Sequence, residues 1–271
     1  RPFMFAYASD GRGNNGAGER DLRGVNAYML KKICALSVYN EARFLQFTGD
    51  LVDGYTNSPG RISLELANWK RAAEPFASLL PCIAGFGNHE GLLHIFRSEK
   101  GRVRVDRFPF ATESAEVMFA RNFVNPVNGP VSEDGAEYDP DSGQTNFPPY
   151  AETVFYYTWD NVAMVVLNSN YWFAPSLESH PESSGNLHGY VMDNQLQWLK
   201  ETLARFEDDS AIDHVFVTIH TPIFPNGGHV GDDMWYDGDN GVRAIVNGTP
   251  VERGIIERRD ALLDLMMNHS S

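Results

Sequence analysis

Apolar residues in the N-terminal third of the chain fall into two alternating patterns. Continuous apolar runs at residues 3–8, 43–47 and 80–86 are typical of buried strands. Between these runs, residues 20–39 and 62–79 carry apolar side chains at the spacing of an amphipathic helix. The predicted order is strand, helix, strand, helix, strand, which favours right-handed crossovers and a largely parallel sheet covered by helices.

The pattern is looser over the rest of the chain. From about residue 97 to residue 150, and again over about residues 221–250, Gly, Pro, Asn and acidic residues break every period, so we predict irregular insertions there. Two β-rich runs at 153–159 and 162–169 predict a hairpin, and residues 214–219 predict a further buried strand.

Helical spacing returns at residues 196–206 and at about 255–268. The chain contains no internal repeat, low-complexity tract or linker that would require a second domain. We therefore expect residues 1–271 to form a single α/β domain.

Composition and charge narrow the possible partners. The chain has 36 acidic and 22 basic residues, a net charge of −14, which repels nucleic acid and anionic membranes. It has no apolar run long enough to span a membrane, so we expect a soluble protein or one whose targeting segment has been removed. The acidic balance favours a secreted or periplasmic protein, with a cytoplasmic location as the alternative. Two cysteines, Cys34 and Cys82, exclude a disulfide scaffold, and we expect both to be buried.

Each predicted buried strand ends at a residue that can bind a metal ion. Asp10 follows the first strand, Asp50 the second, Asn88 and His89 the third, and His220 the fourth. Ligand sites form outside the carboxyl ends of parallel strands, so we expect these side chains to converge. Carboxylate, amide and imidazole donors suit Mn, Fe or Zn.

Three of these strand ends resemble a known family. They resemble, in order, the GDxxDxG, GNH[DE] and VxxH blocks of the calcineurin-like metallophosphoesterases. The matching segments are Gly-Asp-Leu-Val-Asp-Gly at 49–54, Gly-Asn-His-Glu at 87–90 and Val-Thr-Ile-His at 217–220. The agreement runs from residue 3 to about residue 268, and the segment after His220 resembles the purple-acid-phosphatase side of that superfamily. The resemblance implies a metallophosphoesterase-type β-sandwich flanked by helices.

The resemblance also implies a dinuclear metal centre. Asp50 would bridge two divalent or trivalent ions (Mn, Fe or Zn), Asp10 would bind the first ion, and Asn88 with His220 would bind the second. A hydroxide that bridges the two ions would hydrolyse a phosphate mono- or diester.

Two further residues would assist the reaction in this interpretation. His89 would protonate the leaving oxygen or stabilise the charge of the transition state. Asp53 would hold the His89 imidazole in its useful tautomer. Glu90 follows the block at 87–89, and we expect it to orient the loop rather than to react.

The chain departs from the family pattern in two places. The family opens with DxH, whereas the sequence here is Asp10-Gly11-Arg12; a guanidinium cannot bind a cation, so we predict that Arg12 binds substrate phosphate. The closing GHxH block is absent, so we expect the sequence to be a fragment, truncated at its C-terminus. His229, in a Gly-Gly-His segment, is a candidate substrate-binding residue, with a plain loop residue or a replacement metal ligand as alternatives.

The sequence thus predicts a metal-dependent phosphoesterase acting on a small phosphoester. The alternative is a non-catalytic or single-metal relative that serves as a binding module. A phosphoanhydride hydrolase would share the same chemistry. The substrate depends on the two insertions, whose sequences match no pattern that we can interpret, and the oligomeric state is not encoded in any feature noted above.

Overall fold

A computed structural model describes residues 2–13, 22–141, 143 and 146–268. The N-terminal third follows the predicted alternation, which is confirmed. Its elements are β1 (Ala6–Ala8), α1 (Ala27–Tyr39), β2 (Leu45–Phe47), α2 (Pro59–Ala73), η1 (Glu74–Phe76) and β3 (Cys82–Ala84). The three strands form one parallel sheet in the order β1-β2-β3.

A second three-stranded sheet comes from the C-terminal half. It contains β6 (Phe155–Trp159), β7 (Val162–Val166) and β8 (His214–Thr218). The predicted hairpin is present, because β6 pairs antiparallel with β7, and β8 then pairs parallel with β7. Two long helices accompany this sheet: α5 (Asp193–Glu207) precedes β8 in the sequence, and α6 (Ile255–Asn268) follows it. None of the described helices has the length and apolar character needed to cross a membrane.

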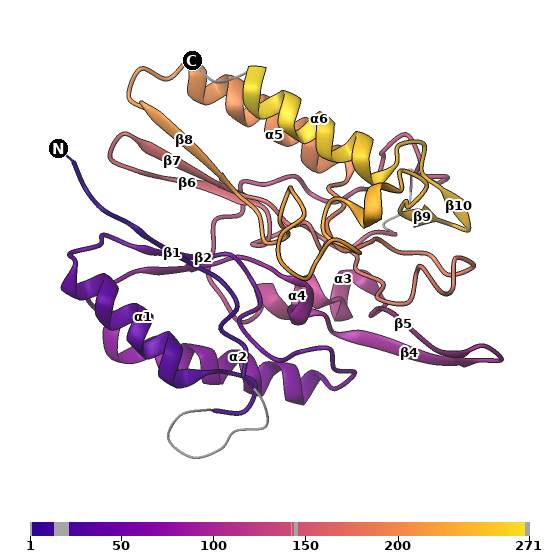
Figure 1. The fold of residues 1–271 in the computed structure, drawn as a ribbon, viewed down its shortest axis with the longest axis horizontal. Helices are drawn as coiled ribbons and strands as arrows, with labels where there is room; N and C mark the ends of the chain where they lie inside the picture. The colour runs from indigo at the N-terminus through magenta and orange to yellow at the C-terminus, as the bar shows by residue number, and fades with distance from the viewer. Residues whose placement is uncertain (1, 14–21, 142, 144–145, 269–271) are drawn as a thin grey trace.

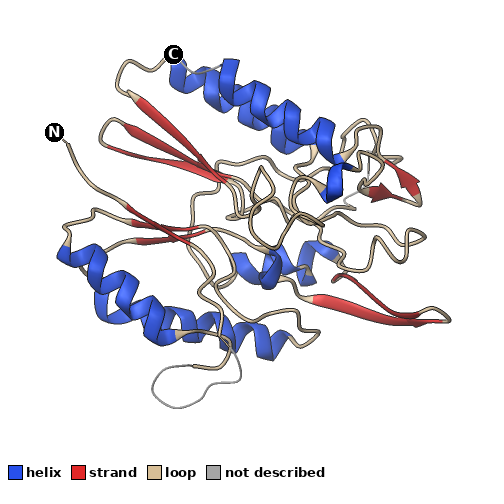
Figure 2. Cartoon of the chain, viewed as in Figure 1, coloured by secondary structure: helices blue, strands red, loops and turns tan. Residues whose placement is uncertain are grey.

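The two sheets face each other between two helical layers (Figures 1 and 2). The ring of Phe44, just before β2, lies 5.6 Å from that of Tyr157 on β6, and the Tyr157 hydroxyl donates to Gln46 Oε1 at 2.9 Å. Helices α1 and α2 cover the first sheet, where Trp69 packs on Phe47. Helices α5 and α6 cover the second sheet, where Phe206 packs on Tyr156. The predicted mixed α/β sandwich with flanking helices is confirmed.

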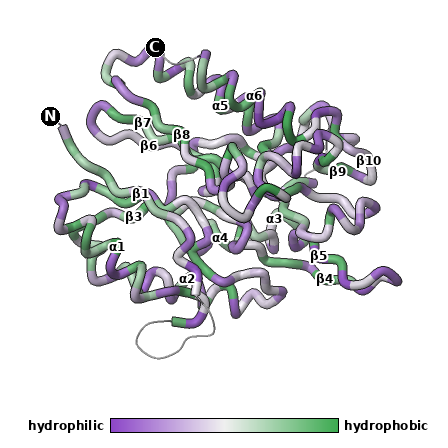
Figure 3. Tube along the Cα trace, in the orientation of Figure 1, coloured by the Kyte–Doolittle hydropathy of each residue, from purple (hydrophilic) through white to green (hydrophobic). Residues whose placement is uncertain are grey.

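The outer helices alternate between apolar and polar residues along their length, as expected for elements with one buried face (Figure 3). Polar side chains define where they begin. The Asn26 side chain accepts from the Met29 backbone N–H at the start of α1, and Ser58 accepts from the Arg61 N–H at the start of α2. Proline at the first position of α2 costs no hydrogen bond there.

The prediction of an irregular insertion from residue 97 is wrong for its first part. The chain forms a hairpin and two short helices there: β4 (Leu93–Ser98), β5 (Gly101–Asp106), α3 (Phe110–Glu113) and α4 (Ala115–Ala120). The Gly and Pro residues that break the period mark the turn and the helix starts rather than disorder. The second insertion contains only short elements: η3 (Tyr236–Gly238), β9 (Ile245–Val246) and β10 (Thr249–Pro250).

Two smaller predictions also need correction. Strand β8 was expected to be buried, but the side chains of Val215 and Phe216 are exposed, because β8 is an edge of its sheet in the described residues. Cys34 is buried as expected, whereas Cys82 is half-buried; neither forms a disulfide.

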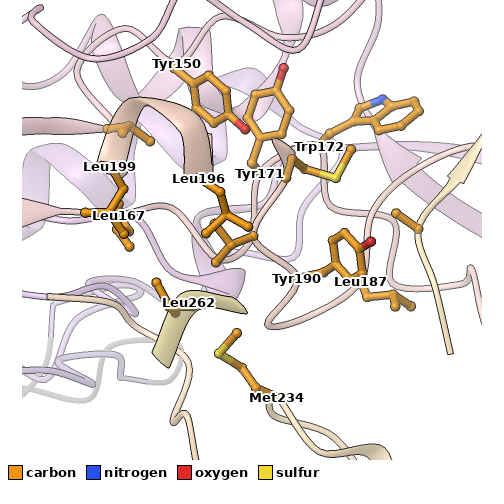
Figure 4. Close-up of a cluster of buried hydrophobic side chains, with 14 of the residues drawn as sticks. Tyr150, Leu167, Tyr171, Trp172, Leu187, Tyr190, Leu196, Leu199, Met234 and Leu262 are labelled. Carbon is orange, nitrogen blue, oxygen red and sulfur yellow. The ribbon is translucent and has the colours of Figure 1, made fainter. Parts of the chain in front are cut away.

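The largest apolar core lies beneath α5 and α6 and contains many aromatic side chains (Figure 4). Tyr150 and Tyr171 stack with their ring centroids 4.0 Å apart. Trp172 and Tyr190 belong to the same cluster, which anchors the segment that follows β7. This segment borders the strand-end loops described next.

Candidate metal centre

The loops that follow β2, β3 and β8 meet at one point. His220 Nε2 lies 3.2 Å from Asp50 Oδ1 and 3.0 Å from Asn88 Oδ1. The His220 imidazole therefore contacts a carboxylate and an amide oxygen that come from two other, distant parts of the sequence. Their convergence follows from the parallel strand order, since the carboxyl ends of the strands share one edge.

Two glycines allow this approach. Gly49 has a φ of +126°, and a Cβ built on it would lie 2.6 Å from the Gly87 backbone nitrogen. A Cβ on Gly87 would lie 2.5 Å from the Asp50 nitrogen. The loops after β2 and β3 thus pack backbone against backbone, which only glycine permits at these two positions.

Asp10 and Arg12 lie on the other side of Asp50. Arg12 Nη1 donates to Asp50 Oδ2 at 2.7 Å, and Arg12 Nη2 lies 3.9 Å from Asp10 Oδ1. The Asp10 side chain is more than half exposed, whereas that of Asp50 is buried. The structure therefore brings Asp10 next to Arg12, while Asp50 is shared between Arg12 and the Asn88–His220 pair.

The pKa of Asp50 is held below its ordinary value despite burial. Burial is the largest influence and raises this pKa, but the hydrogen bond from His220 and the charges of His220 and His89 together outweigh it. Asp50 also accepts from the His89 backbone N–H at 3.1 Å. The carboxylate is thus kept ionised, as a metal ligand must be.

Glu90 joins the loops after β2 and β3 through hydrogen bonds to their backbones. Its buried carboxylate accepts from the backbone N–H groups of Gly87, Asp50, Leu51 and Val52 at 2.7, 2.9, 2.8 and 3.3 Å. Burial raises the pKa of Glu90 well above its ordinary value, and the nearby Asp50 charge raises it further. One side chain thereby fixes the backbone on which Asp50 stands.

The predicted role of the Asp53 carboxylate needs correction. His89 Nδ1 lies 2.6 Å from the backbone carbonyl of Asp53, so the carbonyl, and not the carboxylate, orients the imidazole. The carboxylate instead accepts from Arg61 Nη2 at 2.6 Å. His89 Nε2 is 3.9 Å from Asp50 Oδ2, and burial lowers the pKa of His89.

Two residues at this site escaped the sequence reasoning. The Tyr55 hydroxyl accepts from Asn88 Nδ2, and its ring packs 4.4 Å from that of His89. The His188 ring lies 6.3 Å from that of His220, and its Nδ1 is 2.8 Å from Asn170 Nδ2. Tyr55 directly follows the block at 49–54, which is a usable signal, whereas His188 lies in a loop without any period.

A cavity of about 300 Å³ opens beside these residues. Its lining includes Tyr55, Asn88, Arg104, Phe173 and His188, so it combines aromatic, polar and charged groups next to the donor cluster. A larger cavity of about 810 Å³ lies along α5 and α6, but it shares no lining residue with the donor cluster. Cavity size alone would thus have pointed to the wrong place.

His229, the predicted substrate-binding residue, is not brought into this cluster by any contact in the described residues. Its exposed ring contacts the neighbouring Asp232, with Nδ1 3.1 Å from Oδ1. With Asp233, these two residues form a group whose ligand atoms lie within 4.8 Å of one another. Asp232 also lines the cavity of about 300 Å³, so the loop that carries His229 borders the site.

The donor atoms around Asp50 Oδ1 fit a divalent metal ion. They comprise one anionic oxygen, one neutral oxygen and one nitrogen, a set that suits Mn, Fe or Zn. The described residues around Asp50 Oδ2 fit such an ion poorly, because a guanidinium already contacts this oxygen and Asp10 is the sole further carboxylate beside it.

Comparison with known proteins identifies the family of the chain. The family model for calcineurin-like phosphoesterases matches residues 27–248. A solved dimetal phosphatase from Danio rerio is 14% identical, with a TM-score of 0.48 over 98% of this chain and 78% of that one. The solved structure of PhoD is 13% identical, with a TM-score of 0.47 over 99% of this chain and 49% of that one. No curated protein sequence matches the chain. Since the family model covers most of the sequence, including every donor around Asp50 Oδ1, the chain belongs to the calcineurin-like phosphoesterase family.

Proposed function

We propose that this protein hydrolyses a small phosphate mono- or diester with a divalent cation bound by Asp50, Asn88 and His220. The observation that carries the proposal is the contact between these three donors, at 3.0 and 3.2 Å, at the edge of a cavity. Membership of the family supports phosphoester hydrolysis and divalent metal ions in general. The cation, when bound, would polarise the phosphoryl group and lower the pKa of a coordinated water.

Arg12 is placed to bind the phosphoryl group of the substrate. One of its nitrogens is held by Asp50 Oδ2, and the side chain is 41% exposed, which leaves further N–H groups for a ligand. A guanidinium binds phosphate oxygens through two parallel hydrogen bonds. The salt bridge to buried Asp50 fixes the orientation of this planar group before substrate arrives.

His89 is placed to handle a proton of the reaction. Its Nδ1 donates to the Asp53 carbonyl, so Nε2 is the nitrogen that faces the Asp50 side of the site. Tyr55 packs against the imidazole ring and restricts its rotation. His89 would therefore transfer a proton at the leaving oxygen through Nε2.

The cavity of about 300 Å³ is the proposed place for the organic part of the substrate. Phe173 and Tyr55 contribute aromatic surface to its lining, and Arg104 and Glu178 contribute opposite charges. A volume of this size suits a small leaving group rather than a polymer. Export from the cytoplasm stays a prediction.

The Asp50→Ala variant tests the proposed function. Loss of the carboxylate that contacts both His220 and Arg12 should lower hydrolysis of p-nitrophenyl phosphate or bis(p-nitrophenyl) phosphate by on the order of a thousandfold. Chelation of the wild type should have the same effect, and Mn²⁺ or Zn²⁺ should restore it. Asp264→Ala, on the exposed face of α6, is the matched control and should retain full activity. Equal turnover of Asp50→Ala and the wild type would refute the proposal.

A further inference from the structure

The two oxygens of the Asp50 carboxylate face different partners. Oδ1 lies 3.2 Å from His220 Nε2, the same nitrogen that lies 3.0 Å from the Asn88 side-chain oxygen. Oδ2 accepts from the Arg12 guanidinium at 2.7 Å. A carboxylate can bridge two metal ions through both oxygens or through one, but here the Arg12 guanidinium occupies the space beside Oδ2 that a second ion would need.

The Oδ1 side is built for a metal ion. Asn88 donates through Nδ2 to the Tyr55 hydroxyl, which leaves its Oδ1 as a free acceptor facing His220. Without a metal ion, His220 Nε2 donates to Asp50 Oδ1. The Ser9 hydroxyl lies 3.4 Å from Nδ1, so the proton can move to Nδ1 and leave the Nε2 lone pair for a metal ion. Partners on the far side of each ligand are the usual means of orienting metal ligands.

The Oδ2 side is built around the guanidinium. The backbone of Arg12 pairs with Val25 in an isolated antiparallel bridge, and the carbonyl of Gly11 accepts from the Asn26 N–H at 2.9 Å. Arg12 therefore projects from a fixed backbone rather than from a free loop. A guanidinium stays protonated in proteins and has no lone pair for a metal, so it repels a cation that would bind at the same oxygen.

The charges of the site balance with a single ion. Asp10 and Asp50 contribute two negative charges and Arg12 one positive charge, so the three side chains together carry one negative charge. One divalent ion converts this to one positive charge, which suits an anionic phosphoester. The cationic function of a second ion is thus already present in the protein.

We infer that this centre binds one divalent metal ion, at Asp50 Oδ1, Asn88 and His220, and that the Arg12 guanidinium takes the place of a second ion at Asp50 Oδ2. Arg12 then neutralises this oxygen and presents N–H groups to the substrate phosphate. The phosphate role rests on the proposed function, whereas the number of ions does not.

The number of bound ions can be measured directly. The purified protein is stripped with a chelator, loaded with Mn²⁺ and desalted, and its metal content and electron paramagnetic resonance spectrum are recorded. We expect one Mn²⁺ per chain with the six-line spectrum of an isolated ion. Two ions per chain with an exchange-coupled spectrum would overturn the inference.

Substitution of Arg12 tests its part in the count. Arg12→His removes the guanidinium and adds an imidazole beside Asp10 and Asp50, so we expect a second Mn²⁺ and exchange coupling. Arg12→Lys keeps a positive charge there and should still bind one ion. An Arg12→His variant that remains at one ion would show that Arg12 does not set the count, and would overturn the inference.

Asn88→Ala separates the two metal arrangements. With a single ion at the Oδ1 side, loss of this ligand should remove nearly all bound Mn²⁺. If the variant instead retains one tightly bound ion, a separate metal site exists and the inference fails. Circular dichroism and thermal unfolding of each variant establish that it is folded before its metal content is compared.

Activity distinguishes this inference from the proposed function. A protein that binds one Mn²⁺ but hydrolyses no phosphoester keeps the inference and refutes the proposed hydrolysis. A protein that hydrolyses p-nitrophenyl phosphate with two coupled ions does the reverse.

Discussion

Buried carboxyl groups brace two regions of this protein in different ways. In the loops after β2 and β3, Glu90 accepts only from backbone N–H groups, four of them on the segments that carry Asp50 and Asn88. In the insertion that follows β4, Glu133 accepts from tyrosine hydroxyls. Asp106 accepts from the Ala115 N–H at the start of α4 and interacts with the carboxyl group of Glu116. The first arrangement fixes the geometry of a site, and the second holds a scaffold together.

Glu133 shows how the insertion is attached. Its carboxylate accepts from the hydroxyls of Tyr150, at 2.6 Å, and of Tyr138, and from the backbone N–H groups of Asn194 and Gln195, at 3.0 and 3.2 Å. The last two groups lie in the first turn of α5, where an anion is favoured by the helix dipole. Glu133 thus joins the insertion to the helix that covers the second sheet.

The difference between the regions concerns their donors. Backbone N–H groups cannot rotate away, so Glu90 transmits a fixed position to Asp50. Tyrosine hydroxyls can rotate, and a second carboxyl group can itself gain or lose a proton, so the hydrogen-bond partners in the insertion can adjust to pH and to substitution. Four substitutions test this contrast, and they are arranged by the size of the expected effect.

The largest effect is expected for Glu90→Gln. Glutamine keeps one acceptor oxygen and turns an NH₂ group toward two backbone N–H groups, so two buried hydrogen bonds are lost at a total cost of about 3 kcal/mol. Because the same bonds position Asp50, Mn²⁺ affinity should fall as well. Urea denaturation and metal titration measure both effects. Glu113→Gln, which alters a half-exposed ion pair in the insertion, is the control and should change stability little. A loss in Glu90→Gln no greater than in this control would contradict the contrast.

The sequence predicted the first region well for a physical reason. Asp50, Asn88 and His220 each follow an apolar strand directly, and parallel strands bring their carboxyl ends together, so strand order alone implies the convergence. The glycines before Asp50 and Asn88 gave a further local signal. What the pattern could not show was the atom involved in each contact, as at Asp53, where the carbonyl replaces the expected carboxylate.

The insertion was predicted poorly because its contacts are made between distant residues. The β4–β5 hairpin begins before residue 97, and its position is fixed by contacts such as that of Arg104 with Ser176, far along the chain. His188 reaches the site from a loop whose path depends on packing beneath α5 and α6. No local period encodes such contacts.

The second largest effect concerns the pH dependence of stability at Glu133. Burial raises the pKa of Glu133 from 4.5 to about 6. The native state therefore holds the Glu133 proton more tightly than the unfolded state does. The protonated side chain contributes fully to the free energy of unfolding below pH 4.5, and this contribution is lost as the pH rises through about 6. The shift corresponds to about 2 kcal/mol.

Glu133→Gln should remove this slope. Between pH 4.5 and pH 7, the free energy of unfolding of the variant should rise relative to that of the wild type by about 2 kcal/mol. Urea denaturation at three pH values provides the measurement. The relevant quantity is the difference in slope and not the absolute stability, since the amide also alters the bonds to the tyrosines. Parallel slopes for both proteins would exclude Glu133 as the titrating group.

Tyr55→Phe returns to the strand-end loops with a smaller effect. The substitution removes the hydroxyl that accepts from Asn88 Nδ2 but keeps the ring that packs on His89. Loss of such an outer partner should weaken metal binding about tenfold without unfolding the protein. Isothermal titration with Mn²⁺ measures the change, and Tyr39→Phe, at an exposed position on α1, is the control. Unchanged affinity would mean that Asn88 is oriented by other contacts.

The smallest effect is expected at the Asp106–Glu116 pair, which joins β5 to α4. Burial, followed by repulsion from Glu116, raises the pKa of Asp106 well above its ordinary value, which favours one proton shared between the two carboxyl groups. Glu116 also accepts from the Trp172 backbone N–H at 2.7 Å, and an amide at this position would keep that bond.

Glu116→Gln replaces the shared proton with an amide N–H that needs no titration. At low pH, where the wild-type pair holds its proton, the free energy of unfolding should change by less than about 1 kcal/mol. At high pH the variant should be the more stable protein, because the raised pKa of Asp106 makes wild-type stability fall as the pH rises. Urea midpoints at the two pH values decide the matter. A variant that is destabilised equally at both would show that this pair acts through fixed contacts, as Glu90 does, and the contrast between the two regions would disappear.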